Sequence, residues 1–171
     1  IGQSPAMMEL RRTIERVANS DISVCITGET GTGKELIADA IHRLSPRRDG
    51  PLVKINCASI PKELLESELF GYVPGAFTGA SRQGQTGKFV QANGGTILLD
   101  EIAEMSLELQ SKLLRVLQDR QVEPVGGSHP ISLNIRVLSS TNRNLWELVD
   151  EGKFRRDLFY RLNVLCLFVP P

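Results

Sequence analysis

Hydrophobic residues recur along this chain in two patterns that alternate from one end to the other. Compact apolar or β-branched runs, which are typical of strands buried on both faces, lie at 22–27, 51–56, 94–101, 134–141 and 164–169. Apolar residues spaced by three and four positions, which predict helices, occur at 4–20, 34–44, 61–70 and 107–120, and two short helical pieces follow residue 141. Strands that alternate with helices predict an α/β fold, with a mostly parallel sheet flanked by helices.

Local start signals agree with the helical spacing. Ser4 suits an N-cap with Pro5 at the first helical position, and Pro61 stands at the start of another predicted helix. Ser106 is placed to cap the helix at 107–120. With 171 residues, no internal repeat and no obvious linker, the chain is expected to form one domain over residues 1–171.

Composition excludes several classes of protein. The 20 basic and 20 acidic residues cancel, so net charge points neither to nucleic acid nor to a membrane surface. The apolar runs are strand-sized and too short to span a bilayer, and the first residues, IGQSPAMM, lack the basic and apolar parts of a secretion signal. We therefore expect a cytoplasmic protein with no membrane partner.

Cysteine and histidine usage changes this picture little. Cys25, Cys57 and Cys166 are odd in number and widely spaced, so they predict neither a disulfide framework nor a metal site. We expect them to be buried small apolar side chains in a reducing compartment. His42 and His129 have no nearby partner of a ligand type, and we expect both to be solvated or locally bonded.

The stretch GETGTGKE at 28–35 follows a predicted strand and opens a predicted helix. It fits the pattern G-x-x-x-x-G-K through Gly28, Gly33 and Lys34. In this pattern backbone N–H groups wrap a phosphate chain, and the lysine reaches the outer phosphates. Residue 35, where Ser or Thr normally holds the metal, is Glu35. An acid there could contact magnesium directly, contact it through water, or abolish its binding, and the pattern leaves these readings open.

An acidic pair, Asp100 and Glu101, closes the predicted strand TILL at 96–99. One acid at such a place can hold Mg²⁺ while its neighbour polarises the attacking water, which is the division of labour that phosphoryl transfer needs. The carboxyl ends of parallel strands meet at one edge of a sheet, so the pair is expected beside residues 28–35. Hydrolysis of a nucleoside triphosphate is therefore the leading reaction.

Two further strand ends carry polar residues. Ser140, Thr141 and Asn142 end the strand at 134–141 and could report whether the terminal phosphate is present, or could cap the helix of NLWELV. Asn56 ends the strand at 51–56 and could hold Glu101 in an idle orientation, or serve as an ordinary turn residue. The local pattern leaves both pairs of alternatives open.

Residues 71–80 read GYVPGAFTGA and hold three glycines, one proline, two aromatic residues and no charge. A loop this apolar in a soluble protein either belongs to the core or contacts a partner. Its own residues do not decide between these two possibilities.

With GETGTGKE, GAFTGA, TILLDE, STNRNL and FRRDLFYRLNV in this order, the chain resembles the AAA+ central domain of bacterial enhancer-binding proteins, which activate sigma-54 RNA polymerase. The resemblance covers essentially all 171 residues, and GAFTGA is its most specific element. It implies a P-loop AAA+ α/β core, ATP and Mg²⁺ as cofactors, and ATP hydrolysis coupled to remodelling of the polymerase. It also implies a homo-oligomeric ring, which is hexameric in the family.

The resemblance assigns expected roles to individual residues. Asp100 corresponds to the Mg²⁺–water ligand and Glu101 to the activator of water. Glu35 matches the glutamate that this subfamily usually has after the phosphate-binding lysine, and it is expected beside the metal. Nucleotide contacts are implied for Gly28, Glu29, Thr30, Gly31, Thr32, Gly33, Lys34 and Glu35. The remaining catalytic roles fall on the switch residue Asn56, the first sensor Thr141 and Asn142, and the trans-acting Arg155 and Arg161. Without the family, the charges of EGKFRRD would indicate a solvated helix face.

For the apolar loop, the resemblance implies contact with sigma-54. The contact residues are Gly75, Ala76, Phe77, Thr78, Gly79 and Ala80, with Phe77 and Thr78 foremost and the glycines as hinges. ATP binding is expected to free Glu101 from Asn56 and to move outward the helix that bears Phe77 and Thr78. The segment EPVGGSHPI at 123–131 resembles a second loop that moves with GAFTGA, although its glycine pair also suits an ordinary hairpin turn.

The chain departs from the family pattern in three respects. Tyr72, Val73 and Pro74 replace residues that are usually polar or charged, and Pro74 would stiffen the loop arm. Asn144 replaces a common Asp after the sensor. The sequence stops at FVPP, before the family's small helical lid, and it holds no regulatory domain or helix-turn-helix, so DNA contact is expected only through absent residues. A chain without the lid is expected to be monomeric in solution.

Two other functions compete with a sigma-54 activator. A nucleotide-dependent binding switch would hold ATP and contact a partner with little hydrolysis, which Glu35 or the missing lid could cause. An AAA+ motor acting on other clients would be a third class, but its pore loops usually carry an aromatic–apolar pair without flanking glycines and Thr. Phosphate release separates the first alternative from the activator, and binding to sigma-54 separates the second.

Overall fold

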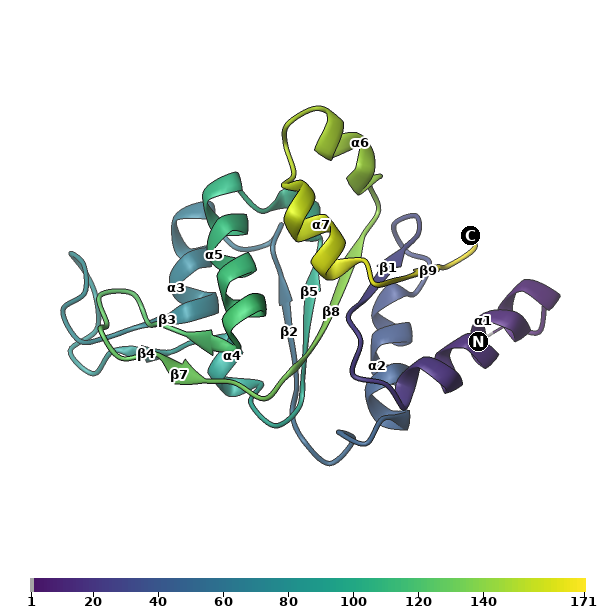
Figure 1. Cartoon of the computed structure of the whole chain (residues 1–171), viewed down its shortest axis with the longest axis horizontal. Coiled ribbons are helices and arrows are strands. Elements are labelled where there is room, and N and C mark those ends of the chain that lie inside the picture. Colours follow the sequence, from purple (N-terminus) through teal and green to yellow (C-terminus); the bar gives the residue numbers. More distant parts are fainter. Residues whose placement is uncertain (1) are drawn as a thin grey trace.

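The computed structural model describes residues 2–171, and five parallel strands form its central sheet (Figure 1). The strands are β1 (Val24–Thr27), β2 (Leu52–Asn56), β5 (Thr96–Asp100), β8 (Arg136–Thr141) and β9 (Leu165–Phe168). Their order is β2-β5-β8-β1-β9, and each neighbouring pair is parallel. The predicted α/β fold with a mostly parallel sheet is therefore confirmed.

Helices cover both faces of this sheet. One face packs against α1 (Pro5–Ala18) and α2 (Lys34–Leu44). The other packs against α3 (Lys62–Phe70), α4 (Lys88–Gln91), α5 (Leu107–Asp119), α6 (Leu145–Asp150) and α7 (Arg156–Leu162). Side chains alternate across each strand, so Val24 and Ile26 of β1 face the first group while Cys25 between them faces the second. The central strands β5, β8 and β1 are buried on both faces, as their runs predict, whereas the edge strands β2 and β9 are only partly buried.

The helix starts predicted from the sequence are formed. Ser4 Oγ accepts a hydrogen bond of 3.3 Å from the Met7 N–H, and Ser106 Oγ accepts one of 3.3 Å from the Leu109 N–H. Pro61 is the N-cap of α3. One cap prediction is wrong, because the cap of α6 is Asn144 rather than a residue of 140–142. Its Oδ1 accepts from the Glu147 N–H at 3.2 Å.

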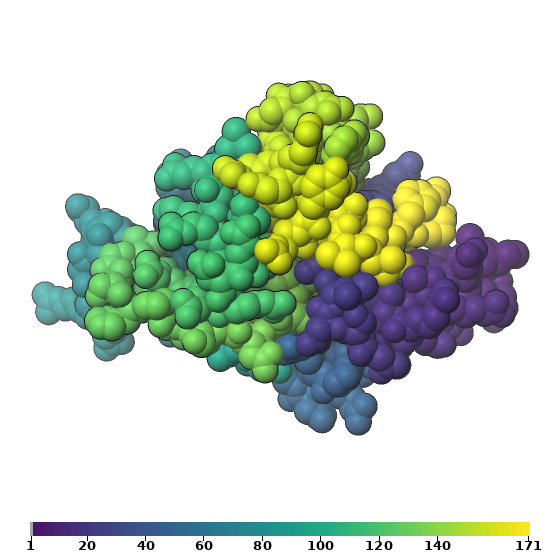
Figure 2. All heavy atoms as spheres, viewed as in Figure 1, coloured from purple at the N-terminus to yellow at the C-terminus, as the bar shows by residue number. Residues whose placement is uncertain are grey.

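Two short hairpins project from the sheet and form the lobe at the left of Figures 1 and 2. They are β3 (Gly71–Tyr72) with β4 (Gln85–Thr86), and β6 (Gln121–Val122) with β7 (Ile131–Ser132). Backbone hydrogen bonds join them, from the Val73 N–H to the Val125 carbonyl at 3.2 Å and from the Val125 N–H to the Gly71 carbonyl at 2.8 Å. The lobe, residues 71–86 and 121–132, is therefore one unit with two loops.

Two predictions about single residues need correction. His42 is buried, and its ring nitrogens lie 2.8 Å from Thr96 Oγ1 and 3.1 Å from the Gly50 carbonyl oxygen, so it joins α2 to the sheet instead of facing solvent. Cys166 is exposed because β9 is an edge strand. Cys25 and Cys57 are buried as expected, and burial raises the pKa of the Cys25 thiol to about 11. Residues 2–171 contain no helix with the length and apolar character needed to cross a membrane.

Candidate functional site

The carboxyl end of the sheet carries the glycine-rich turn between β1 and α2. Gly31 and Gly33 have φ angles of 83° and 90°, in the left-handed region that favours glycine. Gly28 is constrained by space instead, since a Cβ there would lie 2.8 Å from the Val169 carbonyl oxygen and 2.9 Å from Thr32 Oγ1. The turn continues directly into the N-terminus of α2, where backbone N–H groups without bulky side chains are suited to binding an anion.

Lys34 lies inside this turn and is almost fully buried. Its ammonium donates to the carbonyl oxygens of Gly28 and Glu29, each at 2.9 Å. Thr32 Oγ1 donates to the same Glu29 carbonyl at 2.8 Å, which tightens the turn. The structure therefore holds a positive charge at the centre of the glycine-rich loop.

The acidic pair follows β5 at the same sheet edge. Asp100 Oδ1 accepts from the Glu101 N–H at 3.0 Å and from the Ser140 hydroxyl on the neighbouring strand β8. Glu101 has φ 54° and ψ 48°, a left-handed conformation that is strained for a residue with a side chain. Such strain persists only where the surroundings enforce it, and it is concentrated at functional sites.

Electrostatics distinguishes the two acids. Burial, followed by the charge of Asp100, raises the pKa of Glu101, and the nearby Lys34 opposes the rise. A carboxylate with a raised pKa is a stronger base than a solvated one. Beside the pair, burial and then the charges of Asp100 and Glu101 raise the pKa of Cys57 to about 12, so this thiol stays protonated at neutral pH.

The predicted sensor residues lie beside the loop. Asn142 Nδ2 donates to Thr30 Oγ1 at 3.0 Å, which connects the end of β8 with the glycine-rich turn. Thr141 is fully buried, pairs with Thr27 of β1, and accepts a hydrogen bond of 3.0 Å from the Arg143 N–H at Oγ1. Asn142 thus contacts the candidate phosphate loop directly, while Thr141 holds the turn that presents Asn142.

Asn56 and Glu35 have other partners in this structure. Asn56 Oδ1 accepts from the Ala58 N–H at 2.9 Å, as in a turn, and within residues 2–171 its side chain makes no hydrogen bond with Glu101. Asn56 does pair in register with Asp100, so it lies at the same edge. Glu35 Oε1 lies 2.9 Å from Lys54 Nζ, a partner that the sequence analysis missed because the two positions are 19 residues apart.

The two arginines occupy different surfaces. Arg155 is the N-cap of α7, and its guanidinium binds Asp157 through Nε and NH2, at 3.0 Å and 2.8 Å from the two carboxylate oxygens. Arg161 is exposed in the last turn of α7 and lines a separate hollow with Asp21 and Val164. Neither arginine lines the hollow beside this chain's own glycine-rich loop.

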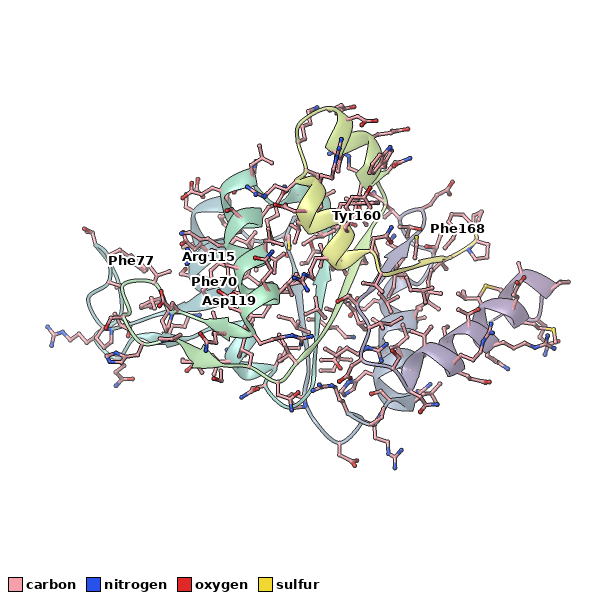
Figure 3. All side chains as sticks on the ribbon, viewed as in Figure 1. Phe70, Phe77, Arg115, Asp119, Tyr160 and Phe168 are labelled. Carbon is pink, nitrogen blue, oxygen red and sulfur yellow. The ribbon has the colours of Figure 1, made fainter. Side chains whose placement is uncertain are left out.

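That hollow, of about 420 Å³, has aromatic walls that the sequence analysis missed. Trp146, Phe159 and Phe168 line it together with Gly28 and other loop residues. Figure 3 shows Phe168 near the chain's C-terminal end; like Tyr160 of α7, it lies away from the lobe that carries Phe77. The aromatic residues of NLWEL and LFYRL could have indicated this wall in the sequence, but periodicity alone assigns such residues to the core.

The GAFTGA loop is exposed at the tip of the lobe, so the alternative of a buried turn is wrong. Phe77 keeps 42% of its surface exposed and lies far from Phe168 in Figure 3. Its ring packs edge-on against Tyr72 with centroids 4.9 Å apart. Gly75 and Gly79 have φ angles of 72° and 89°. The expectation that Phe77 lies on a helix is wrong, because α3 ends at Phe70 and residues 71–84 form strand and turns.

The second loop contacts the first. A Cβ on Gly126 would lie 2.9 Å from the Cβ of Ala76 and 3.3 Å from Val73 Cγ2. Behind this contact, a hollow of about 490 Å³ separates the second loop from α5, and its lining includes Phe70, Arg115 and Asp119, which Figure 3 labels. The segment 123–131 is thus both the turn of a hairpin and a neighbour of GAFTGA.

Comparisons with known proteins agree with this geometry. The family model of the Sigma-54 interaction domain matches residues 1–168. The chain is 61% identical over its 171 residues to the DNA-binding transcriptional activator HyfR of Escherichia coli (strain K12), of which it covers 25%. It is 54% identical over 171 residues to the regulator NtrC of the same strain, of which it covers 36%. The chain thus spans about a quarter to a third of the length of these relatives.

Solved structures extend the comparison to the fold. NtrX from Brucella abortus matches with a TM-score of 0.93 and 46% identity, over 99% of this chain and 38% of that one. The P-loop NTPase domain of a sigma-54 transport activator from E. coli matches 100% of this chain and 99% of that one, with a TM-score of 0.67. Its 20% identity makes this a likeness of fold alone. With the family model matching nearly every residue, the chain belongs to the sigma-54 interaction domain family of bacterial transcriptional regulators and has the P-loop NTPase fold.

Proposed function

We propose that this chain is the ATPase part of a sigma-54-dependent activator and couples ATP hydrolysis to remodelling of sigma-54 RNA polymerase. The observation that carries the proposal is the gathering of Lys34, the acidic pair and Asn142 at one sheet edge, while a separate lobe exposes Phe77 and Thr78. Structures of NtrX from B. abortus in complex with ADP and with ATP, each 46% identical to this chain, support ATP as the nucleotide.

The residues of the acidic pair fit a magnesium ion. Asp100 Oδ1 is occupied by two donors, and Oδ2 accepts no hydrogen bond from residues 2–171. Mg²⁺ keeps several waters and takes only one or two carboxylates beside phosphate oxygens, so a site without three clustered acids is sufficient. Glu35 would join Asp100 only by exchanging its ion pair with Lys54. Bound magnesium would neutralise charge that develops on the phosphates.

Each residue of the site has a defined part in hydrolysis. Lys34 turns from the loop carbonyls to the outer phosphates, for which its charge is suited. Glu101 accepts the proton of the attacking water at its carboxylate. Burial raises the pKa of this carboxylate and makes it a stronger base. Asn142 registers the terminal phosphate through its hydrogen bond to Thr30, and Thr141 supports it by holding the turn that presents Asn142.

Movement at the site reaches the lobe through α3. Asn56 lies beside Asp100 in the sheet and begins the turn that leads into α3, which runs on into β3 and the GAFTGA loop. A rotation of the Asn56 side chain that releases Oδ1 from the Ala58 N–H and lets Nδ2 donate to the Glu101 carboxylate would reorganise this turn and shift α3 with the loop. The hollow between α5 and the second loop leaves room for the lobe to move.

Arg155 and Arg161 act on the nucleotide of a neighbouring subunit in this proposal. Their fixed charge and forked donors suit a transferring phosphoryl group, and both lie away from the chain's own phosphate loop. Such a role requires a homo-oligomeric ring, for which we propose a hexamer. The chain supplies the α/β part of each subunit over residues 1–171.

The first experiment compares wild type with Thr78→Ala in the full-length protein that contains this chain. Each is mixed with sigma-54 and ADP–aluminium fluoride, which mimics the phosphoryl group in transfer. We expect a nucleotide-dependent complex for wild type, its loss for Thr78→Ala, and ATP turnover within about twofold of wild type. Thr86→Ala, an exposed change in the same lobe, is the matched control and should retain the complex.

Other outcomes select the competing functions. Loss of ATP binding in Thr78→Ala would make the loop structural and contradict its role as a contact. A complex with sigma-54 but negligible steady-state phosphate release would favour a nucleotide-dependent binding switch. Good ATP turnover with no complex for either protein would favour a motor acting on other clients.

A further inference from the structure

We infer that Gln110 is a positioning residue that sets where Arg155 is presented to the neighbouring subunit. The inference rests on the proposed trans-acting role of Arg155 and deepens it. Gln110 lies on α5, within LELQSKLL, where it interrupts a stripe of leucines that face the core. It is fully buried, with 0% of its surface exposed. A buried amide is retained only where its polar atoms are satisfied, so its partners indicate what it does.

The partners of Gln110 come from two segments that are far apart in the sequence, one just before α5 and one just before α7. Its Nε2 donates to the Met105 carbonyl at 2.9 Å and to the Lys153 carbonyl at 3.1 Å, and its Oε1 accepts from the Arg155 N–H at 2.8 Å. Both amide hydrogens and the amide oxygen are thus used. Met105 ends the short 3₁₀ helix Ile102–Glu104 that begins directly after Glu101. One side chain therefore links the segment after the acidic pair to the turn before α7.

This link fixes one backbone group at the start of α7. Glu151, Gly152 and Lys153 are exposed, so few apolar contacts hold the turn in place. The bond to the backbone of Arg155 acts at the N-cap of α7, one residue after the buried Phe154. Because a misplacement of about 1 Å at a catalytic group can cost about 100-fold in rate, a fixed N-cap matters for an arginine that must reach across an interface.

The test uses the full-length protein and Gln110→Met, which keeps the length of the side chain and removes its hydrogen bonds. Gln118→Met, an exposed change on the same helix, is the matched control. We expect Gln110→Met to lower kcat for ATP hydrolysis roughly 10- to 100-fold while KM stays within about twofold. The control should leave both values unchanged. Gln110→Asn, which shortens the reach by one methylene, should lower kcat in the same sense and provides a milder variant.

Mixing of subunits separates positioning from a merely structural role. Subunits with Lys34→Ala carry an intact Arg155 but no working phosphate loop. When they are mixed with Gln110→Met subunits, the nucleotide sites of the latter receive a correctly placed arginine from the neighbour. We expect the activity of the mixture to exceed the sum of the separate activities by about threefold or more, since one trans-acting arginine is worth far more than this.

A reference mixture keeps the inference distinct from the proposed function. Arg155→Ala with Lys34→Ala should recover activity in the same way, and its failure would refute the trans-acting arginine itself. Recovery there but none with Gln110→Met would overturn the role of Gln110. Loss of ATP binding by both Gln110 variants would also overturn it, because Gln110 would then support the fold as a whole.

Discussion

Glu101 combines a strained backbone with an unfavourable electrostatic position. Its left-handed conformation follows directly on β5, and burial and Asp100 raise its pKa above the ordinary value of 4.5. The folded protein therefore keeps this proton to a higher pH than the unfolded chain does. The corresponding stability is fully present below pH 4.5 and is lost as the pH rises through the pKa of the folded state.

Glu101→Gln should thus lower ATP turnover and raise the free energy of unfolding. Without the carboxylate, ATP turnover should fall roughly 100- to 10,000-fold while ATP is still bound. The free energy of unfolding at pH 7 should rise by up to about 1 kcal/mol after allowance for solvent screening, because the charged form is no longer desolvated. Urea unfolding at pH 7 and pH 4.5 measures this, with exposed Glu9→Gln as control. A gain that is equal at both pH values would contradict the electrostatic cause.

Arg136 anchors the amino end of β8 to α1. Its buried guanidinium donates to the carbonyl oxygens of Val17 at 2.9 Å, Ala18 at 3.1 Å and Ile22 at 3.3 Å. Arg136→Met should leave the Ala18 and Ile22 carbonyls without this donor, while the Val17 carbonyl keeps its backbone N–H donors at the end of α1. The loss should cost about 3 kcal/mol of unfolding free energy, measured by urea denaturation. Exposed Arg12→Met should cost less than about 0.5 kcal/mol. Equal losses for the two variants would show that the carbonyl contacts contribute nothing.

At the scale of elements, α5 connects the acidic pair, the lobe and α7. It begins at the Ser106 cap close after the acidic pair and ends next to β6 of the lobe, and it packs against α7. Ser106→Ala should cost about 1 kcal/mol of unfolding free energy, because one N–H of the first turn loses its acceptor. Thermal or urea unfolding beside Ser132→Ala, an exposed change in β7, measures the effect. A loss no larger than that of the control would show that α5 does not depend on this cap.

At the scale of the whole molecule, Arg155 and Arg161 lie on different surfaces from the glycine-rich loop. If Arg155 completes a neighbour's site, ATP hydrolysis per subunit should rise as the protein concentration increases through assembly. The full-length protein should show at least about a tenfold rise in specific activity between its monomeric and assembled states, in view of the value of one arginine. Sedimentation measured alongside turnover tests this. Constant specific activity across dissociation would indicate a site complete within one subunit.

Much of the fold was predictable because its signals are local. Five strands and four long helices follow from the spacing of apolar residues, and the caps at Ser4 and Ser106 follow from their own positions. The strands β3, β4, β6 and β7 were not predicted, because two-residue strands in a glycine-rich lobe carry no periodicity. The two hairpins that these strands form are joined by a bridge between residues 53 positions apart in the sequence, Tyr72 and Val125.

The candidate site divides in the same way. By itself the sequence determined the glycine-rich loop with Lys34, the acidic pair and the GAFTGA segment, because each is a contiguous motif whose chemistry depends on neighbours in the chain. The exposure of GAFTGA was decided by the tertiary structure. Only the tertiary structure decided that Asn142 contacts Thr30, that His42 is buried and that Gln110 holds the backbone of Arg155. Arg155 lies 45 residues from Gln110 in the sequence, and Thr30 lies 112 residues from Asn142. Burial obliges the polar groups of His42 and Gln110 to find partners, but only the packing of the elements determines which partner is within reach.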